Sequence, residues 1–150
     1  MMKKNTGKES AKLADSSRFS GLTLLKKSLT RYPTSPDDAV LEVFENLYPG
    51  RKYEVVLDCP EFTSHCPVTG QPDFGDITIR YIPARYCIES KSLKIFLFSF
   101  RNFDIFHEET VNMILDRVVR AAAPFYAEVT GKFKPRGGIA INVRAEYKKK

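Results

Sequence analysis

The sequence contains little of what builds disulfide frameworks or zinc sites. Its 150 residues include only three cysteines and two histidines. An odd number of cysteines argues against a disulfide framework. The spacing of Cys59, Cys66 and Cys87 matches no paired-cysteine zinc pattern. A metal site built from Cys66, His65 and His107 would also lack a recognisable ligand spacing, so we expect no metal.

Long apolar runs and glycine-rich nucleotide motifs are absent as well. No run approaches the roughly 20 residues that cross a bilayer. The first 20 residues are basic and polar, without the apolar segment of a signal peptide. We therefore expect a cytoplasmic protein. No Gly-x-Gly-x-x-Gly motif follows a predicted strand, so a dinucleotide would not bind in the Rossmann mode.

The overall composition is that of one globular domain with basic ends. Hydrophobic residues make up 43% and charged residues 28% of the chain, and the formal net charge is +6. Residues 1–20 lack periodic hydrophobicity and are predicted to form a disordered basic tail, with residues 21–150 as a single domain. Lysine runs at both ends are typical of solvated tails, although the excess charge could also attract a polyanion or a phosphorylated small molecule. Gly21–Leu25 is a short apolar patch that could pin the tail to the domain.

Hydrophobic patterning predicts paired strands and an amphipathic helix. Tyr53–Asp58 is rich in β-branched and aromatic residues, and Asp76–Ile82 alternates apolar and polar residues, so both are predicted strands. They flank a loop and are expected to pair antiparallel. Glu109–Arg120 carries apolar residues at spacings of three and four, which predicts a helix. Tyr126–Phe133 and Ile139–Tyr147 are predicted as two closing strands. By pattern alone, two further segments fit either a helix or a strand: 39–44 and 92–100.

The loop between the first two strands holds the most reactive side chain. Cys66 lies in Phe62–Phe74, a segment punctuated by prolines and glycine and closed by Asp73. A cysteine thiolate is a strong nucleophile, and a carboxyl group seven residues further on could donate or accept a proton. From the residues alone, Cys66 could equally be a small buried apolar residue.

Four segments of the chain resemble one enzyme family. The run Cys59–Ser64, Cys66-Pro67 and Thr69–Phe74 resembles the active-site segment of the 7-cyano-7-deazaguanine reductases, the QueF-type nitrile reductases of queuosine biosynthesis. Three later segments are similar to the same family, in the same order: Glu89–Lys94, Phe106–Glu108 and Lys134–Gly138. The short chain resembles the single-domain branch of that family.

The resemblance implies a fold and an assembly. The predicted order of strand, strand, helix, helix, strand, strand (ββααββ) is that of an α+β protein with an antiparallel sheet and two helices on one face. The resemblance implies the tunnelling fold, a helix at Ser92–Phe100, and a homo-oligomeric ring with active sites at subunit interfaces.

The resemblance also implies a reaction. In it, the Cys66 thiolate adds to a nitrile carbon to give a thioimide, Asp73 acts as general acid/base, and NADPH is the co-substrate of a four-electron reduction to 7-aminomethyl-7-deazaguanine. Cys59 is expected to be structural, and Cys87 lies outside the matched segments.

Further residues are implied as binding groups. Those for the substrate are Glu108, His107, Glu89 and Ser90, and those for the cofactor are Ser90, Lys91, Ser92, Lys94 and Arg136. Serines and free N–H groups at a helix start suit phosphate oxygens, and Lys91 and Lys94 are expected on one helical face. A carboxylate such as Glu108 can accept two N–H donors of an aminopyrimidinone edge. Without the resemblance, the same residues would be interpreted as helix caps and as lysines exposed to solvent.

Two other functions compete with nitrile reduction. An amidine-forming relative that acts on nitrile-modified tRNA would keep the cysteine and the substrate carboxylate, but it is expected to lack the Glu89–Lys94 motif. A non-catalytic basic RNA-binding module would rest on the net charge and scattered aromatic residues. GTP cyclohydrolase, another tunnelling-fold relative, would need zinc ligands that the sequence lacks.

Overall fold

The computed structural model describes residues 19–24 and 31–150, so the predicted tail at 1–20 lies outside the described residues except for its last two. None of the helices in these described ranges is long and apolar enough to cross a membrane. In chain order the elements are η2 (Pro36–Asp38), β1 (Val43–Glu45), β2 (Val55–His65), β3 (Pro72–Ile82), β4 (Tyr86–Ile88), α1 (Ser90–Phe98), α2 (His107–Ala122), β5 (Tyr126–Phe133) and β6 (Asn142–Lys148).

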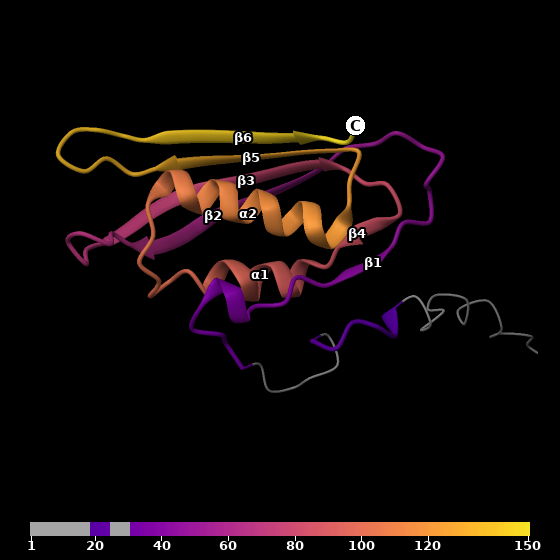
Figure 1. The fold of residues 1–150 in the computed structure, drawn as a ribbon, viewed down its shortest axis with the longest axis horizontal. Helices are drawn as coiled ribbons and strands as arrows, with labels where there is room; N and C mark the ends of the chain where they lie inside the picture. The colour runs from indigo at the N-terminus through magenta and orange to yellow at the C-terminus, as the bar shows by residue number, and fades with distance from the viewer. Residues whose placement is uncertain (1–18, 25–30) are drawn as a thin grey trace, which may run out of the picture.

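The main sheet has four antiparallel strands in the order β2-β3-β5-β6. Figure 1 shows α1 and α2 on one side of this sheet, with α2 running along β5 and β6. Burial alternates along β3, where Ile77, Ile79 and Tyr81 face the helices and the intervening side chains are more exposed. The predicted α+β architecture with two helices on one face is therefore confirmed, as are the two helices and the four main strands.

The core forms where the apolar stripe of α2 meets the sheet. Val111, Ile114 and Val118 recur at helical spacing and are fully buried against the core-facing side chains of β3 and β5. Burial of each such side chain stabilises the fold by about 1.5–3 kcal/mol. This packing fixes α2 across the sheet and so determines where its first residue lies.

The segment Phe62–Phe74 is less of a loop than predicted. β2 runs on to His65 and β3 starts at Pro72, so only residues 66–71 connect them. The pairing continues because Phe62 and Ser64 face the core, and a bulge between Cys59 and Phe62 accommodates the proline at position 60 on the edge strand.

A small second sheet was not predicted. β1 pairs antiparallel with β4, in the register Val43↔Ile88. Of the two alternatives for residues 39–44, the structure contains the strand, although it starts only at Val43. The N-terminal patch does contact the domain: Leu22 is buried, and the Thr23 hydroxyl donates to Glu42 Oε1 at 2.7 Å.

Candidate functional site

Three segments that are distant in sequence meet at one end of the molecule. The β2–β3 connection, the start of α2 and the β5–β6 connection all lie at the left in Figure 1. The pairing of β2 with β3, and of β3 with β5, produces this arrangement. It brings together three of the sequence-predicted site residues that carry charge or can titrate: Asp73, His107 and Arg136.

Cys66 occupies the first position of the β2–β3 connection. Its backbone closes the turn, since its N–H donates to the Gln71 carbonyl (2.9 Å) and its carbonyl accepts from the Gly70 N–H (2.8 Å). Gly70 has φ of 66°, a conformation that favours glycine. The pKa of the Cys66 thiol is lowered, first by a hydrogen bond from the Thr69 side chain and then by backbone N–H groups of the turn and the charge of Arg136. A lower pKa increases the fraction of thiolate, which is the nucleophilic form of cysteine, so the half-buried Cys66 is the candidate nucleophile of this site.

Asp73 is a buried carboxylate held between two cationic or potentially cationic groups. Only 5% of the residue is exposed. Arg136 Nη1 lies 3.2 Å from Asp73 Oδ1, and His107 Nε2 lies 3.4 Å from Asp73 Oδ2. A carboxylate this deeply buried requires such partners. The group is fixed in place, and it can exchange a proton with a molecule bound beside it.

His107 begins α2, and its ring is held by aromatic stacking. The imidazole stacks on Phe133 with ring centres 3.8 Å apart and planes 6° from parallel. Phe133 in turn lies over two glycines of the sheet. A Cβ on Gly75 would approach the Lys132 carbonyl oxygen and Phe133 Cδ1 to 2.9 Å each, and a Cβ on Gly131 would approach Phe133 Cε2 to 2.7 Å. Phe133 and both glycines were not predicted as site residues, although a glycine inside a predicted strand is a signal of close approach.

Gly75→Ala is expected to disturb the site through Phe133. The added methyl group must displace backbone or the Phe133 ring, which should destabilise the fold by about 1–3 kcal/mol and shift His107. Misplacement on the scale of 1 Å can lower the rate by about 100-fold. Denaturant unfolding and steady-state kinetics measure the two effects. Gly50→Ala, where nothing lies within 4 Å of the new Cβ, is the matched control; a Gly75→Ala protein as stable and active as the parent would contradict this account.

Two buried polar atoms next to Asp73 have no hydrogen-bond partner. Among the described residues, the buried side-chain N and O atoms without one are Ser64 Oγ and His107 Nε2. Ser64 is directly opposite Asp73 in the β2–β3 register, and both side chains face the core. Because buried polar groups are normally satisfied, these two unpartnered atoms, one of them 3.4 Å from Asp73 Oδ2 and the other on the residue paired with Asp73, indicate a place for a polar ligand or reacting group.

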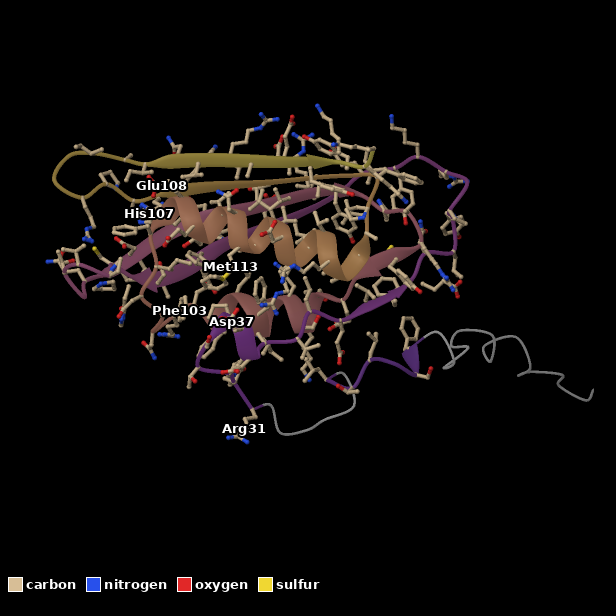
Figure 2. All side chains as sticks on the ribbon, in the orientation of Figure 1. Arg31, Asp37, Phe103, His107, Glu108 and Met113 are labelled. Carbon is tan, nitrogen blue, oxygen red and sulfur yellow. The ribbon has the colours of Figure 1, made fainter. Side chains whose placement is uncertain are left out.

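Glu108 is exposed at the start of α2. Figure 2 shows it beside His107, with both residues at the end of the helix that reaches the site. Its carboxylate is therefore free to meet a ligand that approaches from solvent or from a neighbouring subunit.

The segment Glu89–Lys94 differs from expectation in two respects. The Glu89 carboxylate is buried and accepts the backbone N–H groups of Lys91 (2.8 Å) and Ser92 (2.7 Å), so these N–H groups are not free for phosphate. Lys91 Nζ donates to the Leu24 carbonyl at 2.6 Å, whereas Lys94 lines a groove. The two lysines therefore reach different surroundings, although residues three apart are neighbours on a helix.

The groove lies between the free edge of β2 and α1 and has a volume of about 880 Å³. It includes Ser90 and Lys94 and reaches Thr63 and Phe74, which lie close in sequence to Cys66 and Asp73. Arg101 and Lys134 also line it, together with apolar side chains and two acidic ones, Asp58 and Glu61. The three cations and the apolar residues suit a ligand that is part ring and part anion. Arg136 is not part of its lining.

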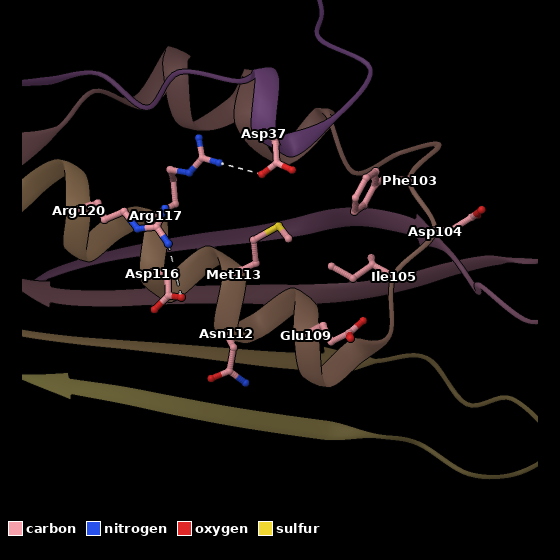
Figure 3. A pocket seen from close by; sticks show the side chains of 10 residues that line it. All are labelled: Asp37, Phe103, Asp104, Ile105, Glu109, Asn112, Met113, Asp116, Arg117 and Arg120. Carbon is pink, nitrogen blue, oxygen red and sulfur yellow. Dashed lines mark ion pairs between the residues drawn. The ribbon is translucent and has the colours of Figure 1, made fainter.

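A second hollow of about 530 Å³ lies between α2 and η2, shown in Figure 3. It contains none of the sequence-predicted site residues. Several of its charged groups pair with one another, as in Asp37–Arg117 at 3.6 Å and Asp116–Arg120 at 3.9 Å. No group of three or more His, Cys, Asp or Glu residues within the described part of the chain is placed to hold a metal ion.

Comparison with known proteins gives a consistent result. A family model described as "QueF-like protein" matches residues 72–150. A protein of Neisseria meningitidis (serogroup C, strain FAM18) named NADPH-dependent 7-cyano-7-deazaguanine reductase is 54% identical over 129 residues, which cover 86% of this chain and 82% of the relative. A Bacillus mycoides (strain KBAB4) protein of the same name is 51% identical over 126 residues, covering 84% and 76%. Among solved structures, an apo archaeosine synthase QueF-Like has a TM-score of 0.59 and 30% identity, covering 62% of this chain and 91% of that one.

Proposed function

This chain belongs to the QueF-like family, and on that premise we propose that it is an NADPH-dependent 7-cyano-7-deazaguanine reductase of queuosine biosynthesis, with Cys66 as the nucleophile and Asp73 as the general acid/base. The reaction converts the nitrile to the aminomethyl group of 7-aminomethyl-7-deazaguanine. The observation that carries the assignment of roles is the pairing of a thiol of lowered pKa with a buried, doubly contacted carboxylate at one end of the sheet.

The first step is the addition of the Cys66 thiol across the nitrile. The sulfur forms a bond to the nitrile carbon, one π pair moves to nitrogen, and the thiol proton ends on that nitrogen, giving a thioimide. Asp73 is the proposed carrier of this proton, because it lies at the start of β3, which follows the connection that holds Cys66, and is held by Arg136 and His107. Later cleavage of the carbon–sulfur bond returns Cys66 to the thiolate, which the hydrogen bonds of the turn stabilise.

The groove beside α1 is the proposed binding site for NADPH, which supplies the hydrides when bound, two per nitrile. Ser90 and Lys94 line it, its three cations suit the phosphates, and its apolar side chains suit the rings. Glu89 supports this site by capping the helix with its carboxylate, and the Ser92 hydroxyl holds the same residue by donating to the Glu89 carbonyl at 2.8 Å. Lys91 secures the N-terminal segment through Leu24.

Glu108 and His107 are the proposed substrate groups. The exposed Glu108 carboxylate can accept two adjacent N–H donors of the aminopyrimidinone edge. His107 has a buried Nε2 without a hydrogen-bond partner, 3.4 Å from Asp73 Oδ2, which supports a role for it beside the reacting nitrile. Glu89 and Ser90, which the resemblance implies as further substrate groups, lie at the start of α1: Glu89 caps the helix, and Ser90 lines the groove.

A ring assembly with sites at subunit interfaces is part of the proposal. β2 and β6 are edge strands of the sheet, and apolar side chains around the site are exposed, including Val68 at 79% and Ile139 at 70%. Exposed edges and apolar patches of this kind favour association. Residues 21–150 would act as one catalytic domain, since its core forms a single cluster. The cytoplasm fits the free thiols of all three cysteines.

The amidine-forming reaction is the second candidate, because the solved relative is named archaeosine synthase. The higher identity to proteins named reductases favours reduction.

A turnover assay separates the candidates. The protein is mixed with 7-cyano-7-deazaguanine and NADPH, the loss of NADPH absorbance is followed, and the product is analysed by mass spectrometry. We expect consumption of two molecules of NADPH per nitrile and an aminomethyl product. Product formation that needs ammonia and leaves NADPH intact would establish the amidine reaction, and salt-sensitive RNA binding without turnover would support a binding module.

A further inference from the structure

The guanidinium of Arg136 contacts both halves of the site described above. Its Nη1 is 3.2 Å from Asp73 Oδ1, and its Nη2 donates to Thr69 Oγ1 at 3.1 Å. Thr69 belongs to the turn that carries Cys66. One rigid, planar group therefore spans the carboxylate and the cysteine turn, a geometry that the forked donors of arginine suit and a lysine would not.

The hydrogen bonds of Thr69 determine where its own proton points. A hydroxyl has one donor and two acceptor sites. Thr69 Oγ1 accepts from Arg136 Nη2 at 3.1 Å and from the Gln71 backbone N–H at 3.3 Å. With both acceptor sites occupied, its hydrogen is left to donate within the six-residue connection that Thr69 shares with Cys66. A hydrogen bond from the Thr69 side chain is also the first cause of the lowered pKa of the Cys66 thiol.

The chain holds Arg136 in position through a tight turn. Arg136 and Ile139 exchange backbone hydrogen bonds of 3.0 and 3.1 Å, and the intervening Gly137 and Gly138 have φ of 58° and 80°. Two positive φ values in a two-residue connection are those of a type I′ turn, which glycine adopts at little cost. The Lys134 N–H donates to the Phe74 carbonyl at 2.8 Å and ties this turn to β3 next to Asp73.

We propose that Arg136 and Thr69 are positioning residues of the nitrile-reducing site: Arg136 links Asp73 to the cysteine turn and orients the Thr69 hydroxyl as a donor to the Cys66 sulfur. The catalytic role in this inference rests on the proposed function, whereas its test measures the thiol alone and needs no turnover. It gives Arg136 a role inside the catalytic cluster in place of the phosphate contact implied by the resemblance.

The test measures the alkylation of Cys66 by iodoacetamide as a function of pH, in the absence of nitrile and NADPH. The rate is followed on the Cys66-containing peptide by mass spectrometry, so that Cys59 and Cys87 do not contribute. Thr69→Val, which keeps the shape and loses the hydroxyl, should raise the pH midpoint and slow alkylation at pH 7 by about fivefold. Thr69→Ser should restore the parent profile. Arg136→Gln should also raise the midpoint, and Arg136→Lys should recover it only in part.

The outcomes decide the inference independently of the reductase assignment. An unchanged midpoint in Thr69→Val, or an equal rise in Thr69→Ser, would overturn the role of the hydroxyl. An unchanged midpoint in Arg136→Gln would overturn the role of the guanidinium. Lys132→Gln, an exposed cation on β5, is the control for simple loss of charge. Thermal melts show that each variant is folded, and a parent protein that alkylates as expected but does not reduce the nitrile would contradict only the proposed function.

Discussion

Cys66→Ala is expected to abolish nitrile reduction, with kcat lowered by about 10⁴-fold or more. Without the thiol no carbon–sulfur bond forms, and the nitrile is left unactivated toward hydride. The fold should persist, because Cys66 contributes its backbone to the turn and its side chain lies outside the hydrophobic core. The thermal transition should therefore remain close to that of the parent.

Intact mass measures this prediction directly. Mixed with 7-cyano-7-deazaguanine in the absence of NADPH, the parent protein should gain the mass of one substrate, and Cys66→Ala should not. Cys87→Ala is the control: Cys87 is buried and contacts Tyr53 at 3.5 Å, so its loss affects packing but not the adduct. An adduct that survives in a folded Cys66→Ala protein would show that another group is the nucleophile.

The local hydrophobic pattern was sufficient to predict the helices and strands that bury one face. The stripe of α2 and the alternation along β3 each have a period that only one structure satisfies, and both predictions are confirmed. The pattern failed at the end of β2, where prolines and polar residues suggested a loop. The strand continues there because its partner β3 supplies the ladder and the core accepts Phe62 and Ser64. Pairing between strands is not visible in the local sequence.

The site residues divide in the same way, into those that the local sequence reveals and those that only long-range contacts reveal. Cys66 and Asp73 stand out through their residue types and motif, and the structure places Cys66 first in the short connection and Asp73 second in the strand that follows it. Thr69 and Phe133 do not stand out, because their roles come from contacts with Arg136 and His107 across long stretches of chain. The orientation of the Lys91 side chain was likewise not predictable, because it donates to the carbonyl of Leu24, far away in the sequence.

Asp73→Asn is expected to lower the rate of nitrile reduction by about 10²–10⁴-fold. Asparagine keeps the shape and an acceptor for Arg136, but it cannot carry a proton from sulfur to the nitrile nitrogen. Steady-state kinetics and the rate of adduct formation measured by intact mass should fall together. Asp76→Asn is the matched control, because Asp76 is on the same strand but on the opposite face, 3.4 Å from Lys134.

The reactivity of the thiol separates proton transfer from an effect on the nucleophile. The pKa of the Cys66 thiol is lowered first by the hydrogen bonds of Thr69 and Val68 and then by the charge of Arg136, and Asp73 is not among the causes. Alkylation of Cys66 at neutral pH should therefore proceed in Asp73→Asn at about the parent rate, even though adduct formation with the nitrile is slow. This combination would assign the lost rate to the missing proton carrier. If alkylation slowed in parallel with turnover, Asp73 would act through the thiol, and the general acid/base role would have to pass to another group, with His107 the nearest candidate at 3.4 Å.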